Sequence, residues 1–283
     1  MSGHPPKAFP ASGTPVYDSA KRPPPFIEEW LELFHFRALV AHWALRNITL
    51  RYKRSVLGVF WTVIEPLTLM IVLTIVFSNI FVGTIQRFPV YVLAGLTLFD
   101  FFSRASLHMA DEITISQNLS QRIHAPMSTF AVAAIASYMV NWAVALIPMA
   151  LVMAFLGHPF SWALVTLPPA MLLMAMFTLG VGLVVATLGA FFHDFKLVYG
   201  ALLTVLLYST PIIYPLEIVP DKFQALILAN PLTYLLGVFR DPIFLGRVAP
   251  ATAWATSATV ATASLLIGWW VFTRWRDAFV YRA

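Results

Sequence analysis

The sequence predicts an all-α membrane protein with six transmembrane helices and an amphipathic helix in front of them. Of its 283 residues, 59% are hydrophobic and only 11% are charged, a balance outside the usual range of soluble domains. Six stretches also have the roughly 20 mainly apolar residues that a bilayer crossing needs. These predicted spans cover about residues 57–82, 89–108, 128–156, 162–190, 197–214 and 251–273.

Three regions follow one another along the chain. Residues 1–25 are rich in proline, glycine and serine and contain no apolar run, so we expect a disordered tail and no signal peptide. Residues 26–53 place polar side chains at near 3.6-residue spacing and are too charged to span, which predicts an interfacial amphipathic helix. A helix packed on a soluble partner is the alternative. Residues 54–283 then form the six-span domain.

The distribution of basic residues predicts the topology. Six spans put both termini on one side of the membrane, and 13 of the 18 lysines and arginines fall on that side. Four lie on the opposite side, and Arg104 lies within a span. By the positive-inside rule both termini are cytoplasmic. The net charge of +5 therefore reflects topology rather than nucleic-acid binding.

The loop between spans five and six is much longer than the other outer loops. It contains two helix-like pieces, about 221–229 and 232–241, separated at Asn230-Pro231. Each piece has only about ten residues, or roughly 15 Å of helix, too short to cross a bilayer. We therefore expect two short helices that dip into the outer leaflet, shielded by protein or by a watery cavity.

Several catalytic chemistries are excluded by what the sequence lacks. It contains no cysteine and no GxxxxGK phosphate-binding loop, HExxH or GxSxG motif, so thiolate chemistry and ATP hydrolysis by a phosphate-binding loop are ruled out. Its seven histidines show no metal-ligand spacing. We expect no catalytic residue, metal or cofactor in this chain, so any energy that its function needs must come from elsewhere.

Three ionisable residues within predicted spans are the main candidates for a functional path, because a charge in hydrocarbon is costly. Asp100 and Arg104 are four residues apart, so they share a helix face and are placed to pair. Glu65, next to Pro66, is expected either to line an inner vestibule or to form an interhelical hydrogen bond. A purely structural role is the alternative for all three.

Aromatic residues and two polar loops complete the candidates. Aromatic rings cover the apolar faces of sugars and suit a path for a glycan, although most are expected to pack against helices or lipid. The candidate rings are Phe99, Phe101, Phe102, Tyr138, Trp142 and Tyr208. The loops Asp111–Pro126 and Phe191–Lys196 together offer a cytoplasmic docking surface for a soluble partner.

A series of short motifs resembles the ABC-2 type permeases that export bacterial polysaccharides. The segment RNITLRYKRSVLGVFWTVIEPL is similar to the entry into the first span of that family. Further similar segments follow in the family's order over about residues 30–282: PVYVLAGLTLFDFF, IHAP, FFHDF, TPIIYP and NPLTYLLGVFRDPIFLG. The proline-rich tail falls outside the resemblance.

The resemblance implies the permease half of an exporter, located in a bacterial inner membrane. A homodimer of this chain would form the path for a lipid-linked glycan, and a separate ATP-binding subunit, carrying ATP and magnesium, would dock beneath it. A pyrophosphate headgroup would arrive at Arg51, Tyr52, Lys53 and Arg54, where basic side chains suit the anion. Residues implied to couple to the ATPase are Ile113, Ser116, Asn118, Leu119, Arg122, His193 and Asp194. The outer gate would include Pro231, Tyr234 and Arg240.

Two other classes of function stay open from the sequence. One is a membrane-embedded enzyme acting on a polyprenyl-linked sugar, with Asp100 or Glu65 as the base. The other is an ion-coupled transporter that uses Asp100 and Arg104, although no internal repeat supports it. Within the exporter class, the first-span segment is closer to O-antigen exporters, while capsule and teichoic acid remain alternatives.

Overall fold

The computed structural model describes Glu29 and residues 32–53, 60–77, 85, 87–123, 125–192 and 194–280; at 62, 114, 116–123 and 276–280 it describes only the backbone. Every regular element in these ranges is a helix, as predicted. In chain order they are α2 (Arg37–Tyr52), α3 (Phe60–Phe77), α4 (Phe88–Ile123), α5 (Ser128–Phe155), η2 (Trp162–Thr166), α6 (Leu167–Phe191), α7 (Phe195–Ser209), η3 (Leu216–Ile218), α8 (Asp221–Ala229), α9 (Pro231–Phe244) and α10 (Ala251–Val280).

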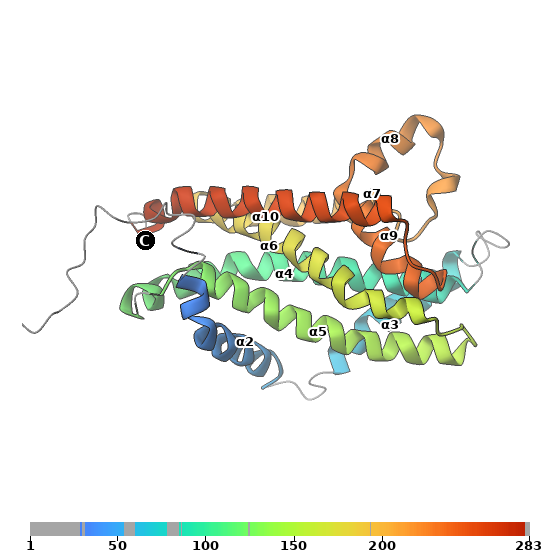
Figure 1. Ribbon diagram of the computed structural model, residues 1–283, viewed down its shortest axis with the longest axis horizontal. Coiled ribbons are helices and arrows are strands. Elements are labelled where there is room, and N and C mark those ends of the chain that lie inside the picture. Colours follow the sequence, from blue (N-terminus) through green and yellow to red (C-terminus); the bar gives the residue numbers. More distant parts are fainter. Residues whose placement is uncertain are drawn as a thin grey trace, which may run out of the picture.

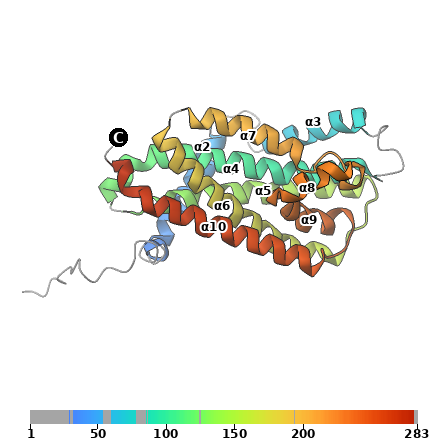
Figure 2. The same cartoon turned by 90° about the horizontal axis from the view of Figure 1, so that it is seen from above.

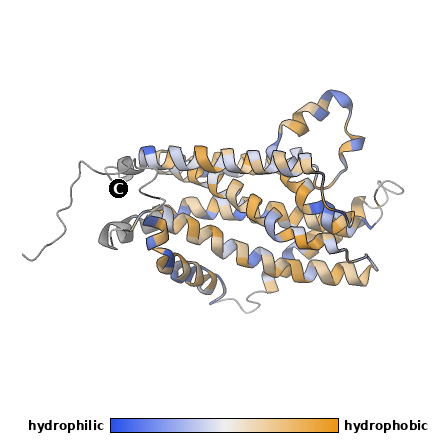
Figure 3. Ribbon diagram, viewed as in Figure 1, coloured by the Kyte–Doolittle hydropathy of each residue, from blue (hydrophilic) through white to orange (hydrophobic). Residues whose placement is uncertain are grey.

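The longest helices run side by side in one elongated bundle (Figures 1 and 2). Helix α2 and the end of α10 lie at one end of the bundle, and α8 and α9 lie at the other (Figure 1). Apolar residues dominate the long helices, whereas hydrophilic residues gather on α2 and around α8 (Figure 3). This distribution matches a bundle whose middle lies in hydrocarbon and whose ends meet water.

Four helical segments are long and apolar enough to cross a bilayer. They confirm four of the six predicted spans: Phe88–Ile113, Ser128–Phe155, Trp162–Phe191 and Ala251–Trp275. The other two correspond to shorter apolar helices, Val63–Phe77 and Phe195–Ser209, each only about 22 Å long at 1.5 Å per residue. Counting α8 and α9 as one bent span gives five. The predicted number of six is therefore not confirmed by the lengths of the described helices.

Two helix ends differ from the prediction for identifiable reasons. Helix α7 ends at Ser209 rather than near residue 214, because Thr210 is extended in front of Pro211, and a residue before proline disfavours helical geometry. Helix α4 continues for 36 residues to Ile123, although residues 111–126 were expected to form a separate stretch between spans. Polar side chains there end the apolar span without ending the helix, and Pro126 follows.

The amphipathic helix is observed in part. Residues 32–35 are helical, Phe36 forms a turn, and α2 then continues to Tyr52. Helix α2 packs beside α5 (Figure 1) and buries Ala44 and Asn47, while Leu45 and Leu50 stay exposed. Exposed leucines beside charged residues are typical of a helix at a membrane interface, and that location stays a prediction.

The two short helices between α7 and α10 are confirmed. Helices α8 and α9 meet at an angle of 87°, and Asn230 stands between them. Its side chain accepts a hydrogen bond from the Leu232 backbone at 3.0 Å and donates one to Thr210 Oγ1 at 2.9 Å. Asn230 therefore caps α9 and ties the bend to the end of α7. The dip of this pair into a membrane leaflet stays a prediction.

Helices α6 and α10 approach each other most closely at two glycines. A side-chain carbon added at Gly268 would collide with the backbone of Gly180, and one added at Gly180 would collide with the backbone at Ser264. Backbones can approach this closely in a membrane only where small residues lie at the crossing. The contact between these two helices therefore depends on the absence of side chains at both positions.

Replacing Gly268 with valine is expected to lower the thermal unfolding midpoint of the purified protein, because the added carbons must push α10 away from α6. Overpacking of this kind costs about 1–3 kcal/mol. Gly189→Val is the matched control, since it places the same residue in α6 where no atom lies within 4 Å of the added carbon. Equal unfolding midpoints for the two variants would show that the close crossing does not stabilise the fold.

Candidate functional site

The three charged residues from the predicted spans form one cluster. Arg104 donates a hydrogen bond through Nε to Asp100 on its own helix and forms an ion pair with Glu65 of α3. The predicted pairing of Asp100 and Arg104 is thus confirmed, and Glu65 makes an interhelical contact. Two carboxylates share one guanidinium, and all three side chains are about half exposed. The cluster therefore links α3 to α4 and carries a formal charge of −1.

A small cavity lies beside this cluster, between α3, α4 and α5. Its volume is about 30 Å³, and it is lined by Pro66, Thr97, Asp100, Phe101, Tyr138, Asn141, Trp142 and Ala145. This volume accommodates one or two water molecules but no sugar ring. The structure thus brings Asp100, Tyr138 and Trp142 together as neighbours of one small cavity, and a glycan path through this point would require the helices to separate.

The aromatic candidates mostly pack against one another. Trp142 packs against Phe101, at a ring distance of 4.6 Å, and against Phe239, at 4.8 Å. Its side chain is buried, so its ring is not free to cover a sugar. Phe99 is buried and lies 6.1 Å from Phe102. Tyr208, by contrast, is 63% exposed, so it is the ring of this group with most of its surface free.

The basic end of α2 contacts the same region of α5. The guanidinium of Arg51 lies over the ring of Tyr138, 3.9 Å from its centre, and Tyr52 donates a hydrogen bond to Asn141 at 2.9 Å. Lys53 is exposed, and Arg54 lies outside the described residues. Since Tyr138 and Asn141 line the cavity, this end of α2 holds a fixed positive charge next to it.

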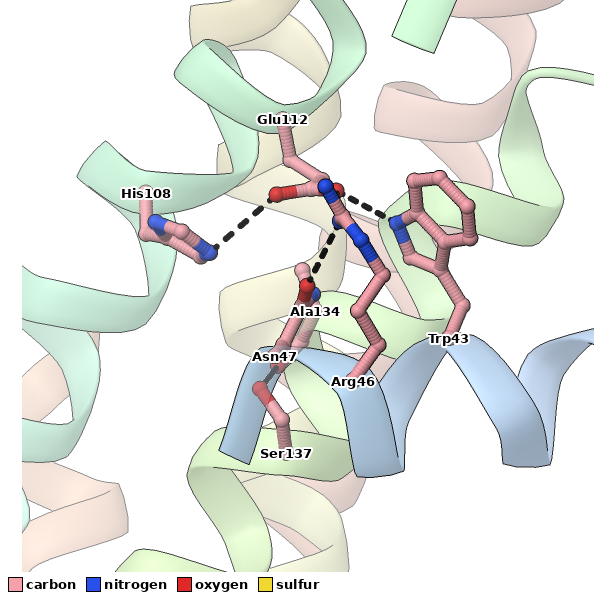
Figure 4. Close-up of polar contacts among 7 residues, drawn as sticks. All are labelled: Trp43, Arg46, Asn47, His108, Glu112, Ala134 and Ser137. Carbon is pink, nitrogen blue, oxygen red and sulfur yellow. Dashed lines mark hydrogen bonds and ion pairs between the residues drawn. The ribbon is translucent and has the colours of Figure 1, made fainter. Parts of the chain in front are cut away.

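A second polar cluster, which the sequence did not suggest, joins α2 to α4 (Figure 4). Its centre is Glu112, which is buried and accepts hydrogen bonds from Trp43 Nε1 and, at 3.5 Å, from Arg46. His108 Nε2 lies 3.4 Å from the other carboxylate oxygen. One signal in the sequence could have indicated this cluster: His108 and Glu112 are four residues apart, which puts both on one face of a helix.

The residues implied to couple to an ATPase extend from the same end of the bundle. Ile113 is buried. Ser116, Asn118, Leu119 and Arg122 belong to the last turns of α4, with only their backbone described, and His193 lies outside the described residues. Asp194 is exposed directly before α7. An ion pair between Lys196 and Asp111 connects the start of α7 to α4, so this region is joined by charged contacts.

The predicted outer residues lie on α9. Pro231 occupies the first turn of the helix, and Tyr234 is partly buried. Arg240 lies over the ring of Tyr91, 4.1 Å from its centre, and donates a hydrogen bond to the carbonyl of Pro211 at 2.8 Å. Arg240 therefore holds α9 against α4 and the segment after α7. In the part of the chain that the structure describes, no three His, Asp or Glu side chains are grouped to hold a metal ion.

Comparison with known proteins identifies the family of this membrane domain. The model of the ABC-2 type transporter family matches residues 39–244. The O-antigen export system permease protein RfbA of Myxococcus xanthus is 26% identical over 251 residues, which cover 88% of this chain and 96% of that protein. The polysialic acid transport protein KpsM of Escherichia coli is 27% identical over 236 residues, covering 79% of this chain and 88% of that protein.

A third relative is named for the export of another polysaccharide. The capsule polysaccharide export inner-membrane protein CtrC of Neisseria meningitidis serogroup A is 24% identical over 213 residues, or 71% of this chain and 77% of that protein. The family match runs from within α2 to the end of α9 and includes the charged cluster. The family match alone covers well over half of the chain. The chain therefore belongs to the ABC-2 type transporter family.

Proposed function

We propose that this chain is the membrane-spanning subunit of an ATP-driven exporter that moves a lipid-linked polysaccharide, most consistently an O-antigen, across the inner membrane. The observation that carries the proposal is the family match over residues 39–244, together with relatives whose names describe polysaccharide export. The first of these relatives is an O-antigen permease matched over 96% of its length, which supports O-antigen over capsule.

The path is formed by two copies of the chain. In the part of the chain that the structure describes, the cavity beside the charged cluster has a volume of about 30 Å³, far too small for a glycan chain. Both shorter apolar helices expose large side chains, among them Ile71 and Ile75 on α3 and Leu202 and Val205 on α7. Such faces suit either lipid or a second copy. In this arrangement α3 and α7 both cross the membrane, which gives six crossings per copy.

ATP hydrolysis takes place on a partner. The chain has no phosphate-binding loop of its own, so ATP and magnesium bind to a separate subunit at the α2 end of the bundle. The excess of basic residues on that side supports a cytoplasmic orientation for it. The partner would touch α2 and the end of α4 near Ile113, and the anionic headgroup of the substrate would arrive at Arg51 and Lys53.

The first test is to purify the tagged full chain gently from its native membrane and to identify the proteins that remain bound in near-equal amount by mass spectrometry. We expect a phosphate-binding-loop ATPase and measurable ATP hydrolysis by the complex. A catalytically dead ATPase, with its phosphate-binding lysine replaced, is the matched control for hydrolysis. Recovery of the chain without any ATPase, under conditions that preserve related complexes, would contradict the proposal and favour an enzyme acting on lipid-linked sugars.

A further inference from the structure

Helix α2 is held to α4 at one buried carboxylate. Glu112 is 4% exposed, and the polar contacts of Trp43 and Arg46 with α4 converge on it (Figure 4). The Arg46 guanidinium also lies 4.1 Å from the centre of the Trp43 ring. The Trp43 ring in turn makes a T-shaped contact with Phe130 of α5, at a ring distance of 4.9 Å. A buried carboxylate is stable only with such partners, so these contacts fix the α4 side of α2, alongside its packing on α5.

The same face of α2 carries the cation at the cavity. Trp43, Asn47 and Arg51 follow at intervals of four residues, which places them on one side of the helix. From Trp43 to Arg51 the helix advances by about 12 Å. A helix this short moves as one piece, so a shift at Trp43 also displaces Arg51 from the ring of Tyr138. The position of Arg51 therefore depends on the contact with Glu112.

Glu112 also lies where α4 leaves the apolar part of the bundle. The apolar segment of α4 ends at Ile113, and the helix continues without a break to Ile123. The neighbouring Asp111 points to a different partner, Lys196 of α7. Two adjacent carboxylates on α4 thus hold two different helices, α2 through Glu112 and α7 through Asp111, at the base of the long polar end of α4.

We propose that Glu112 is a positioning residue that transmits movement of the polar end of α4 to α2 and thereby sets the position of Arg51. The inference rests on the proposed function, in which Arg51 meets an anionic headgroup and a partner acts on this end of the bundle. Glu112 itself touches no substrate. It acts through Trp43 and Arg46, which connect it to the helix that carries the cation.

The position of α2 can be measured directly, because the chain has no cysteine to compete with introduced labels. Spin labels at Leu50 on α2 and Ile115 on α4, both more than half exposed, report the distance between the two helices in the full chain in lipid vesicles. We expect one narrow distance distribution in the parent and a broad, shifted one in Glu112→Gln and in Trp43→Phe, which keeps an aromatic ring against Phe130. Asp111→Asn is the matched control and should leave the distribution unchanged. Identical distributions in all four proteins would overturn the proposal.

A transport measurement separates positioning from general stability. In the complex with its ATPase, Glu112→Gln should raise the half-saturating concentration of lipid-linked substrate about tenfold while the maximal rate of ATP hydrolysis is retained. Adding Arg51→Ala should then cause little further loss, because the two changes remove the same interaction. Fully additive losses would overturn the proposal. A parent chain that exports no glycan and binds no ATPase would refute the proposed function, and the distance measurement would still decide the role of Glu112.

Discussion

Replacing Arg104 with methionine is expected to remove most of the folded protein from the membrane. The substitution leaves Asp100 and Glu65 without their shared guanidinium. An uncompensated charge at the centre of a span costs about 2.5–3.5 kcal/mol on insertion scales. Two carboxylates lose their partner here, but both are about half exposed. We therefore expect the free energy of insertion to worsen by about the cost of one such charge. The amount of membrane-inserted chain and its unfolding midpoint in mild detergent measure the effect.

The controls for Arg104 separate pairing from the loss of a positive charge. Lys222→Met removes an exposed cation from α8 and should leave both readouts unchanged. Asp100→Asn should be milder, because Arg104 keeps its ion pair with Glu65. The neutral combination of Glu65→Gln, Asp100→Asn and Arg104→Met should restore insertion, since no unpaired charge is left in the cluster. If Arg104→Met inserts and unfolds like the parent protein, the cluster does not hold α3 to α4.

The sequence predicted the parts of this fold that depend on local pattern. Asp100 and Arg104 were expected to pair because a spacing of four residues fixes their neighbourhood on a helix, and the pair is observed. The break at Asn230-Pro231 likewise follows from local chemistry, since an asparagine caps a helix that starts with proline. In both cases the information lies within a few residues of the feature itself.

Contacts between helices were harder to predict from the sequence. Glu65 was expected either to line a vestibule or to form an interhelical hydrogen bond. Its ion pair with Arg104 depends on how α3 crosses α4, which no local pattern encodes. Glu112 was not predicted as a contact residue, because a carboxylate at the end of an apolar span normally lies in water. Its burial is created by Trp43 and Arg46 from a helix 66 or more residues earlier. The positions of such partners come from packing alone.

Replacing Arg51 with alanine is expected to reduce export of a lipid-linked glycan by about 10-fold to 100-fold, the range that corresponds to one hydrogen bond to a charged group. The guanidinium lies over Tyr138 beside the cavity, where it is fixed in place rather than free to sample many positions. A fixed cation binds a phosphate anion with less loss of side-chain entropy than a mobile one. The measurement is the amount of glycan at the cell surface at matched levels of membrane protein.

Two further substitutions assign the loss to Arg51 itself. Arg51→Lys keeps the charge but loses the planar group that stacks on Tyr138, so it should fall between the parent and Arg51→Ala. Arg37→Ala removes the same charge from the first turn of α2, 14 residues away. If the position of the cation at residue 51 is decisive, this variant should preserve export. If attraction of α2 to anionic lipid is decisive, it should reduce export as well. Surface glycan that is unchanged in Arg51→Ala, or equally reduced in Arg37→Ala, would show that the basic end of α2 determines topology and does not receive the substrate.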